Sequence, residues 1–328
     1  MDTHDYPRTE SGPSTFGIAT LVVMLVVAAG GLAWVWRAPT EEPPEHLVVP
    51  TAETEPVQFS HEPMDRVCAQ FTDDMGMVDY AALKDDPDDL ISYLSQVKAV
   101  SPHSNFATFP GENEALAYWI NAYNAWMMKA VIDNYPLDSV QDIEPPVFND
   151  ELAVCGGEEM SLNFIENEII RKEFEEPRIH FAVNCASMGC PWLPQEAFFP
   201  DRLDDQLERE TRRFFAAASH LKVAPEESAV YLSPILKWYS EDFTEHIKRI
   251  RRTTAPQPRA GSQRHGTEPT VLDYVRLYAP EDTPEITGGM QVRWQTYGWQ
   301  LNDQGAPWAD MRGDFRPPPE GGVSGAPG

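Results

Sequence analysis

The run of residues 113–135 restricts the possible folds of this chain more than any other feature of its sequence. Apolar side chains occur on every side of a helix drawn through this run, and Pro136 ends it. These side chains are Leu116, Trp119, Ile120, Tyr123, Trp126, Met127, Ala130 and Val131. A helix that is apolar all round is buried, so the run predicts a central helix enclosed by the rest of its domain.

Two carboxamides interrupt this apolar helix. Asn121 and Asn124 are three residues apart and therefore lie on one helix face. A buried amide that finds no hydrogen-bond partner costs about 1–3 kcal/mol. We therefore predict that these two side chains either brace the core or bind a substrate.

Shorter patterns indicate further helices and a few strands. Apolar residues at helical spacing predict helices at 86–98, 162–174, 203–218, 236–247 and 271–277, with Ser161 as the cap of the second. Alternating apolar residues predict strands at 179–183 and 229–232. The predicted fold is a helix-rich α+β domain in which the buried central helix packs on a small sheet.

The amino-terminal part predicts a membrane anchor. Residues 16–36 carry no charged side chain and are long enough to cross a hydrocarbon layer of about 30 Å. The acidic start, with Asp2, Asp5 and Glu10, is unlike that of a cleaved signal peptide. We expect a cytoplasmic tail at 1–15, an uncleaved single-pass anchor at 16–36, a Pro- and Glu-rich linker at 37–57, a domain outside the cytoplasm at 58–303 and a disordered tail at 304–328.

The charge of the chain limits its partners. With 52 acidic and 25 basic residues, the net charge is −27, which disfavours binding to nucleic acid and suits a halophilic protein with an acidic surface. Residues 249–270 form a basic insertion in this acidic chain. Its arginines are Arg249, Arg251, Arg252, Arg259 and Arg264. The insertion is either a solvated loop or a loop that binds anions or headgroups.

Residues 178–191 are the most promising place for chemistry, because His180, Cys185 and Cys190 follow one another closely. A nucleophilic thiolate needs an imidazole or a helix amino terminus beside it. In one straight strand, His180 and Cys185 would lie about 16 Å apart on opposite faces, so the chain has to turn at Asn184 or another base has to act. The other candidate bases are His61, His103, His220 and His246.

The two thiols could also have a structural role instead of a catalytic one. Cys185 and Cys190 could form a small disulfide that fixes the turn, since the four cysteines are too few for a disulfide scaffold. A zinc site with His180 is disfavoured, because the close cysteine pair and the fourth ligand of such sites are missing. We find no phosphate-binding glycine loop or serine elbow, and we expect neither a cofactor nor a metal.

Several stretches together resemble the DUF547 family, whose function is not settled. They are Val78-Asp-Tyr-Ala-Ala-Leu83, Tyr118-Trp-Ile-Asn-Ala-Tyr-Asn124, Ser161-Leu-Asn-Phe-Ile-Glu166 with Arg171, Arg178-Ile-His-Phe-Ala-Val-Asn-Cys185, Gly189-Cys-Pro191, Leu232-Ser-Pro-Ile-Leu-Lys-Trp-Tyr-Ser-Glu-Asp-Phe243 and Tyr297-Gly-Trp-Gln-Leu-Asn-Asp303. The resemblance implies an outline similar to thiol hydrolases of the papain and transglutaminase type. Unlike those enzymes, this chain has no cysteine at the start of the central helix, where their nucleophile lies.

These observations predict a thiol-dependent hydrolase or transferase that acts on an amide or thioester of a peptide or glutathione-like substrate. Cys185 would be the nucleophile, His180 the base and Glu166 the group that orients the imidazole. The amides of Asn121, Asn124 and Asn184 would bind the substrate or its oxyanion. The alternative is a module that binds a peptide or small ligand in the same pocket without turnover.

Overall fold

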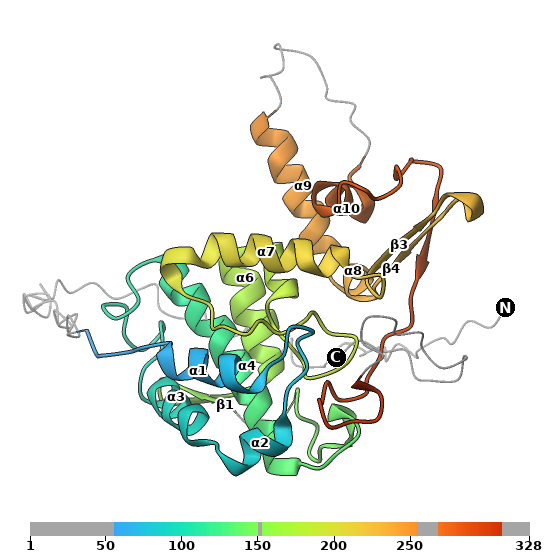
Figure 1. Cartoon of the computed structure of the whole chain (residues 1–328). Helices are drawn as coiled ribbons and strands as arrows, with labels where there is room; N and C mark the ends of the chain where they lie inside the picture. The colour runs from blue at the N-terminus through green and yellow to red at the C-terminus, as the bar shows by residue number, and fades with distance from the viewer. Residues whose placement is uncertain (1–55, 150–152, 255–267, 310–328) are drawn as a thin grey trace, which may run out of the picture. The chain divides into compact units, whose positions relative to one another are not determined.

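The computed structural model of the chain describes residues 56–149, 153–254 and 268–309 (Figure 1). The predicted cytoplasmic tail, the segment 16–36 and the linker up to residue 55 lie outside the described residues. So do residues 255–267 of the basic insertion and the tail beyond residue 309.

The structure corrects the prediction of a membrane anchor. Of the helices in the three described ranges, none combines the length of a bilayer span with enough apolar character. The longest of them, α4 (Glu112–Asn134), has 23 residues, but it carries charged side chains such as Lys129 and Asp133 and its middle is buried in the protein. A single-pass anchor, a membrane partner and a membrane-anchored location outside the cytoplasm are therefore not supported.

The central helix α4 forms as predicted and runs through the first of two hydrophobic cores (Figure 1). Helices α2 (Tyr80–Asp85) and α3 (Asp88–Ala99) pack on it, and α1 (Glu62–Phe71) packs on both of them. The side chains of Tyr118 and Trp119 are fully buried, as expected for a helix that is apolar all round.

The helix predicted at 162–174 is present but changes its winding. It starts as α5 (Leu162–Phe164), widens into the π-helical segment η2 (Ile165–Ile170) and ends as α6 (Arg171–Phe174). Ser161 caps it as predicted, because its side chain accepts a hydrogen bond from the amide of Phe164. Short π-helical segments are frequent at functional sites, and this one holds Glu166 in a buried position.

The strand predicted at 179–183 is wrong. The chain instead forms the 3₁₀-helix η3 (Pro177–Phe181), in which Pro177 lies in the first turn and the Glu176 side chain accepts a hydrogen bond from the Arg178 amide. Residues 179–183 are all buried, so the apolar alternation does not reflect a strand with one buried face. Because the chain is wound up here, the straight-strand geometry assumed for His180 and Cys185 does not apply.

The second hydrophobic core contains the later helices and a sheet of three strands. The sheet has the order β3 (Leu221–Ala224), β4 (Ala229–Leu232), β5 (Gln291–Trp294), with β3 and β4 antiparallel and β4 and β5 parallel. Around it lie α7 (Leu203–Ala216), α8 (Ile235–Trp238), α9 (Ser240–Thr254) and α10 (Val271–Tyr278). The remaining elements are the hairpin β1 (Ala153–Cys155) and β2 (Glu158–Met160), and the 3₁₀ turns η1 (Val140–Asp142), η4 (Pro200–Arg202) and η5 (Pro225–Glu227). The predicted helix-rich α+β class is confirmed.

A carboxyl-terminal segment, residues 297–303, returns to the first core. The amide of Met188 donates a hydrogen bond to the carbonyl of Gln300, and the amide of Gly189 donates one to the carbonyl of Gly298, both at 2.8 Å. A side chain at position 189 would place its Cβ 2.8 Å from the Tyr297 ring, so only glycine permits this approach. The contact brings Tyr297 against the turn that carries the two cysteines.

Candidate functional site

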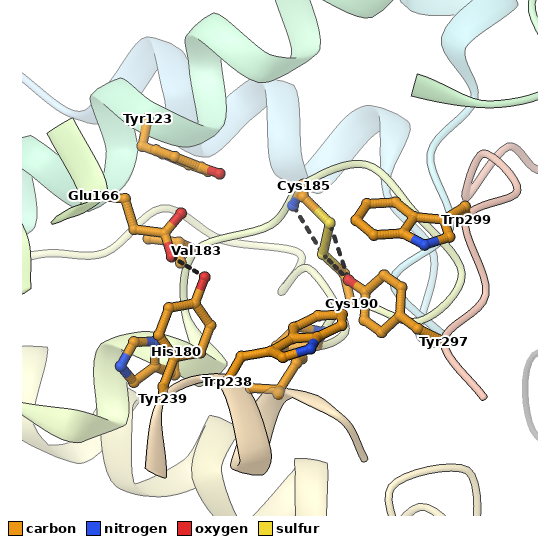
Figure 2. A pocket seen from close by; sticks show the side chains of 12 residues that line it. Tyr123, Glu166, His180, Val183, Cys185, Cys190, Trp238, Tyr239, Tyr297 and Trp299 are labelled. Carbon is orange, nitrogen blue, oxygen red and sulfur yellow. Dashed lines mark hydrogen bonds between the residues drawn. A yellow bond between two sulfur atoms is a disulfide. The ribbon is translucent and has the colours of Figure 1, made fainter. Parts of the chain in front are cut away.

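A narrow cavity lies between the two hydrophobic cores (Figure 2). Its volume of about 30 Å³ accommodates about two water molecules. The lining residues are Tyr123 of α4, Glu166 of η2, His180 of η3, Val183, Cys185, Cys190, Pro191, Ile235 and Trp238 of α8, Tyr239, Tyr297 and Trp299. The predicted catalytic residues Cys185, His180 and Glu166 thus line one cavity.

A carboxylate fixes the imidazole of His180. Its Nε2 lies 2.7 Å from Oδ2 of Asp242 in α9. Asp242 also accepts two hydrogen bonds from Arg171, at 2.7 Å from Nε and 2.9 Å from Nη2. A carboxylate bound by the planar arginine fork has little freedom to rotate, and the imidazole that it holds is therefore oriented.

Burial keeps this imidazole neutral. His180 is 2% exposed, and the loss of hydration lowers its pKa below 6.5 although Asp242 acts in the opposite direction. Burial raises the pKa of Asp242, but hydrogen bonds from His180 and Arg171 outweigh burial and hold that pKa well below its usual range. A neutral imidazole that donates from Nε2 to a carboxylate has an unprotonated Nδ1. Nδ1 of His180 is buried and has no hydrogen-bond partner among the described residues, so it is available as a base.

We predicted that Glu166 would orient the imidazole of His180. In the structure Asp242 holds this imidazole, and Glu166 acts on it only indirectly. Glu166 accepts a hydrogen bond of 2.5 Å from the hydroxyl of Tyr239 (Figure 2). It is also hydrogen-bonded to Tyr123. Burial, followed by the charge of Glu166, raises the pKa of both tyrosines, which therefore remain protonated donors. The Tyr239 ring stacks on the imidazole with 3.9 Å between centroids. Glu166 thus positions Tyr239, and Tyr239 supports His180.

Cys185 and Cys190 form a disulfide at the opposite wall of the cavity (Figure 2). The hydroxyl of Tyr297 lies 3.1 Å from Sγ of Cys185 and 3.2 Å from Sγ of Cys190. Oγ of Ser187 lies 3.1 Å from the Cys185 sulfur, and the Cys185 amide donates to the Cys190 sulfur at 2.9 Å. Both sulfurs are therefore surrounded by hydrogen-bond donors.

Asn124 and Asn184 hold the turn before the disulfide. The Asn124 side chain accepts a hydrogen bond from the Asn184 amide and donates one to the carbonyl of Ala182. The Asn184 side chain accepts from the amide of Ala186, which has a left-handed φ of 58°, and donates to the carbonyl of Pro191. Neither asparagine lines the cavity, so their predicted role as substrate ligands stays a prediction.

Asn121 lies deeper in the core. Its side chain exchanges two hydrogen bonds with the backbone of Phe198 and lies 3.0 Å from Nδ1 of His61. It does not line the cavity either. Of the alternative bases, His61, His103, His220 and His246 are all absent from the cavity wall, which leaves His180 as the imidazole nearest to the chemistry.

The described part of the chain assembles no metal site. Within it, no three side chains of histidine, cysteine, aspartate or glutamate come close enough to hold an ion. The zinc site considered for His180, Cys185 and Cys190 is not formed, because the two sulfurs are bonded to each other.

The sequence prediction gave no role to four residues around His180 and the disulfide, namely Arg171, Tyr239, Asp242 and Tyr297, although Arg171 is among the residues that carry the resemblance. Asp242 and Tyr239 lie in the stretch 232–243 and Tyr297 in the stretch 297–303, both of which carry the resemblance. Those stretches were the available signal, but they do not state a role for any residue in them.

Comparison with known families supports the resemblance for part of the chain. Residues 107–215 match the family model described as "Protein of unknown function, DUF547". Comparison with curated proteins and with solved structures gives no match, so the papain-like outline stays a prediction. The matched residues include Glu166, His180 and both cysteines of the disulfide, but not Asp242 or Tyr297. Residues 107–215 are thus similar to the DUF547 family, and they supply the disulfide and the imidazole of the cavity.

Proposed function

We propose that the protein, in its reduced form, is a thiol-dependent hydrolase or acyl transferase that acts on an amide or a thioester. Cys185 is the nucleophile, and His180 is the base. One arrangement carries the proposal: the buried Nδ1 of His180 has no hydrogen-bond partner among the described residues, His180 lines the same cavity as Cys185, and Nε2 is held by Asp242. Nucleophile, base and orienting carboxylate are the three parts that covalent catalysis of this type requires.

The reaction follows from these groups. His180 takes the proton of the Cys185 thiol through water in the cavity, and the thiolate attacks the carbonyl carbon of the substrate. The bond to the leaving amine or thiol breaks, and His180 returns the proton to it. Water or an acceptor nucleophile then attacks the acyl-cysteine, which releases the product and restores the thiol. Asp242 stabilises the imidazolium in both steps.

The size of the cavity limits the substrate. About 30 Å³ is too little for a peptide side chain of any length, and the aromatic rings of Trp238 and Trp299 form part of the wall. We therefore propose that the cavity takes a small acyl group, while the leaving group, such as a glutathione-like thiol, remains outside.

The test is a comparison of single-cysteine substitutions in reduced protein. Reduced wild type is incubated with an acetyl thioester, the released thiol is followed, and the acyl-cysteine is located by mass spectrometry. We expect an acetyl group on Cys185 and no turnover in Cys185→Ser. The control is Cys68→Ser, because Cys68 is buried away from the cavity and burial raises its pKa. Unchanged hydrolysis of thioesters and amides in Cys185→Ser would overturn the proposal.

The second candidate is a binding module, which the disulfide favours because an oxidised Cys185 has no thiol. In that case a thioether analogue of the thioester binds equally to oxidised wild type and to Cys185→Ser, and neither form turns over a substrate. Calorimetric titration with the analogue separates this module from the enzyme.

A further inference from the structure

The turn that carries the disulfide Cys185–Cys190 has further supports besides this bond. The turn is already fixed by the side chain of Asn184 and by backbone hydrogen bonds from Met188 and Gly189 to the segment 297–303. The two cysteines are only five residues apart, and so short a covalent loop restrains the unfolded chain less than a long one does. The position of both sulfurs at a cavity wall therefore calls for another explanation.

The surroundings of the sulfurs are suited to thiolates. Tyr297 lies within hydrogen-bond distance of both sulfurs, and Ser187 lies beside that of Cys185. The amide of Cys185 donates to the sulfur of Cys190 at 2.9 Å. Hydrogen bonds to a thiolate lower its pKa, and a stabilised leaving thiolate makes a disulfide easier to reduce. Cys68 and Cys155 differ, because burial raises the pKa of each thiol, that of Cys155 to about 12.

We propose that Cys185 and Cys190 are a redox-active pair that undergoes thiol–disulfide exchange with a small dithiol, and that this exchange switches the thiol site on. The switch rests on the proposed function, whereas the exchange itself does not. A small reductant is required because Cys185 is only 9% and Cys190 only 3% exposed, so the thiol of a folded protein has no access.

The exchange transfers two electrons in two steps. A thiolate of the dithiol attacks Sγ of Cys185, the more exposed residue of the pair, and the disulfide bond breaks. The Cys190 thiolate leaves, held by the Cys185 amide and Tyr297. The second thiolate of the reductant then attacks the reductant sulfur that is bonded to Cys185. This step releases the Cys185 thiolate and leaves the reductant as a cyclic disulfide. The protons lost by the dithiol go to the two cysteines, and Cys185 is then free to act as nucleophile.

The experiment uses full-length protein equilibrated with mixtures of reduced and oxidised dithiothreitol. Free thiols are trapped by alkylation and assigned by mass, and thioester hydrolysis and near-ultraviolet circular dichroism are recorded at each ratio. We expect Cys185 and Cys190 to gain their labels together in one two-electron transition, with a folded spectrum throughout and hydrolysis that rises in parallel. Cys190→Ser should hydrolyse the thioester without any reductant, while the Cys155→Ser control should behave as wild type.

Failure of the redox pair and failure of the proposed function have different signatures. Loss of the folded spectrum in step with reduction would show a structural disulfide and overturn the redox pair. Equal hydrolysis in the oxidised and reduced forms would overturn both the switch and the role of Cys185 as nucleophile, because an oxidised Cys185 has no thiol. An inactive Cys190→Ser beside an active reduced wild type would overturn the switch but leave the hydrolase standing. A folded two-electron transition without hydrolysis at any ratio would support the exchange and overturn the proposed function.

Discussion

Nε2 of His180 lies 2.7 Å from Oδ2 of Asp242, although 62 residues separate the two positions in the chain. The 3₁₀-helix η3 supplies the imidazole and α9 supplies the carboxylate, so the pair joins elements of different parts of the sequence. The π-helical segment contributes a third group, Glu166, which reaches the imidazole through Tyr239.

Removal of the Asp242 charge tests this pair. An asparagine can donate to Nε2 of His180, which would leave the proton on Nδ1 and abolish the base. We expect Asp242→Asn to reduce kcat/KM for the thioester roughly 100- to 10,000-fold. The acid limb of its residual pH profile should also lie lower, because Asp242 raises the pKa of His180. Glu241→Gln, which changes the exposed neighbouring carboxylate, is the control; an equal loss in both variants would count against the pair.

The hydroxyl of Tyr297 is expected to stabilise the Cys185 thiolate. In reduced protein, Tyr297→Phe keeps the ring but removes this donor, which should raise the pKa of the Cys185 thiol because the thiolate loses a hydrogen bond. The rate of labelling by iodoacetamide at pH 7 then falls about tenfold, since only the thiolate reacts. Tyr231→Phe, on the surface of β4, should label as fast as wild type. A labelling rate that is identical in all three proteins would exclude this role for Tyr297.

Protonation of His61 should weaken the fold in acid. Burial lowers the pKa of His61 from 6.5 to about 4, so the unfolded chain takes up this proton first as the pH falls. The contribution of neutral His61 to the free energy of unfolding is fully present above pH 6.5 and is lost as the pH falls toward 4. Between pH 7 and pH 5, wild type should lose about 2 kcal/mol more than His61→Asn, measured by urea denaturation. Parallel pH profiles of the two proteins would contradict the prediction.

We expect the side chain of Asn124 to contribute to the free energy of unfolding rather than to substrate binding. Asn124→Ala leaves the amide of Asn184 and the carbonyl of Ala182 without their partner, which should lower the free energy of unfolding by about 2–4 kcal/mol. Asn134→Ala, at the exposed end of the same helix, should change it by less than about 1 kcal/mol. If Asn124 binds substrate, the thioester KM of the folded variant rises; an unchanged KM identifies a structural brace.

The sequence predicts a helix correctly where the helix buries one face, or all of its faces, in the core. The apolar run at 113–135 and the cap at Ser161 correspond closely to α4 and α5. The strand at 179–183 failed because a fully buried 3₁₀-helix can show the same alternation as a strand. Helices α1 and α2 and strand β5 were missed, since short elements depend on tertiary contacts more than on their own pattern.

The candidate site was predictable only in part. His180 and Cys185 stand out because histidine and cysteine are rare in this chain, whereas Asp242 is one of 52 acidic residues. Its role depends on a contact between distant segments, which neither spacing nor composition reveals. The same holds for Tyr297, which reaches the cysteines only because position 189 is a glycine.

The contact of the segment 297–303 with the cysteine turn can form only late in synthesis, because this segment is made long after the two cysteines. Tyr297 follows Cys190 by 107 positions, so the ribosome adds it long after both cysteines have been made. A nascent chain that ends between them holds its two thiols without the donor that later accompanies them. The redox behaviour of the pair is therefore a property of the finished chain, and shortened proteins that end before residue 297 should be oxidised and reduced as ordinary peptide thiols.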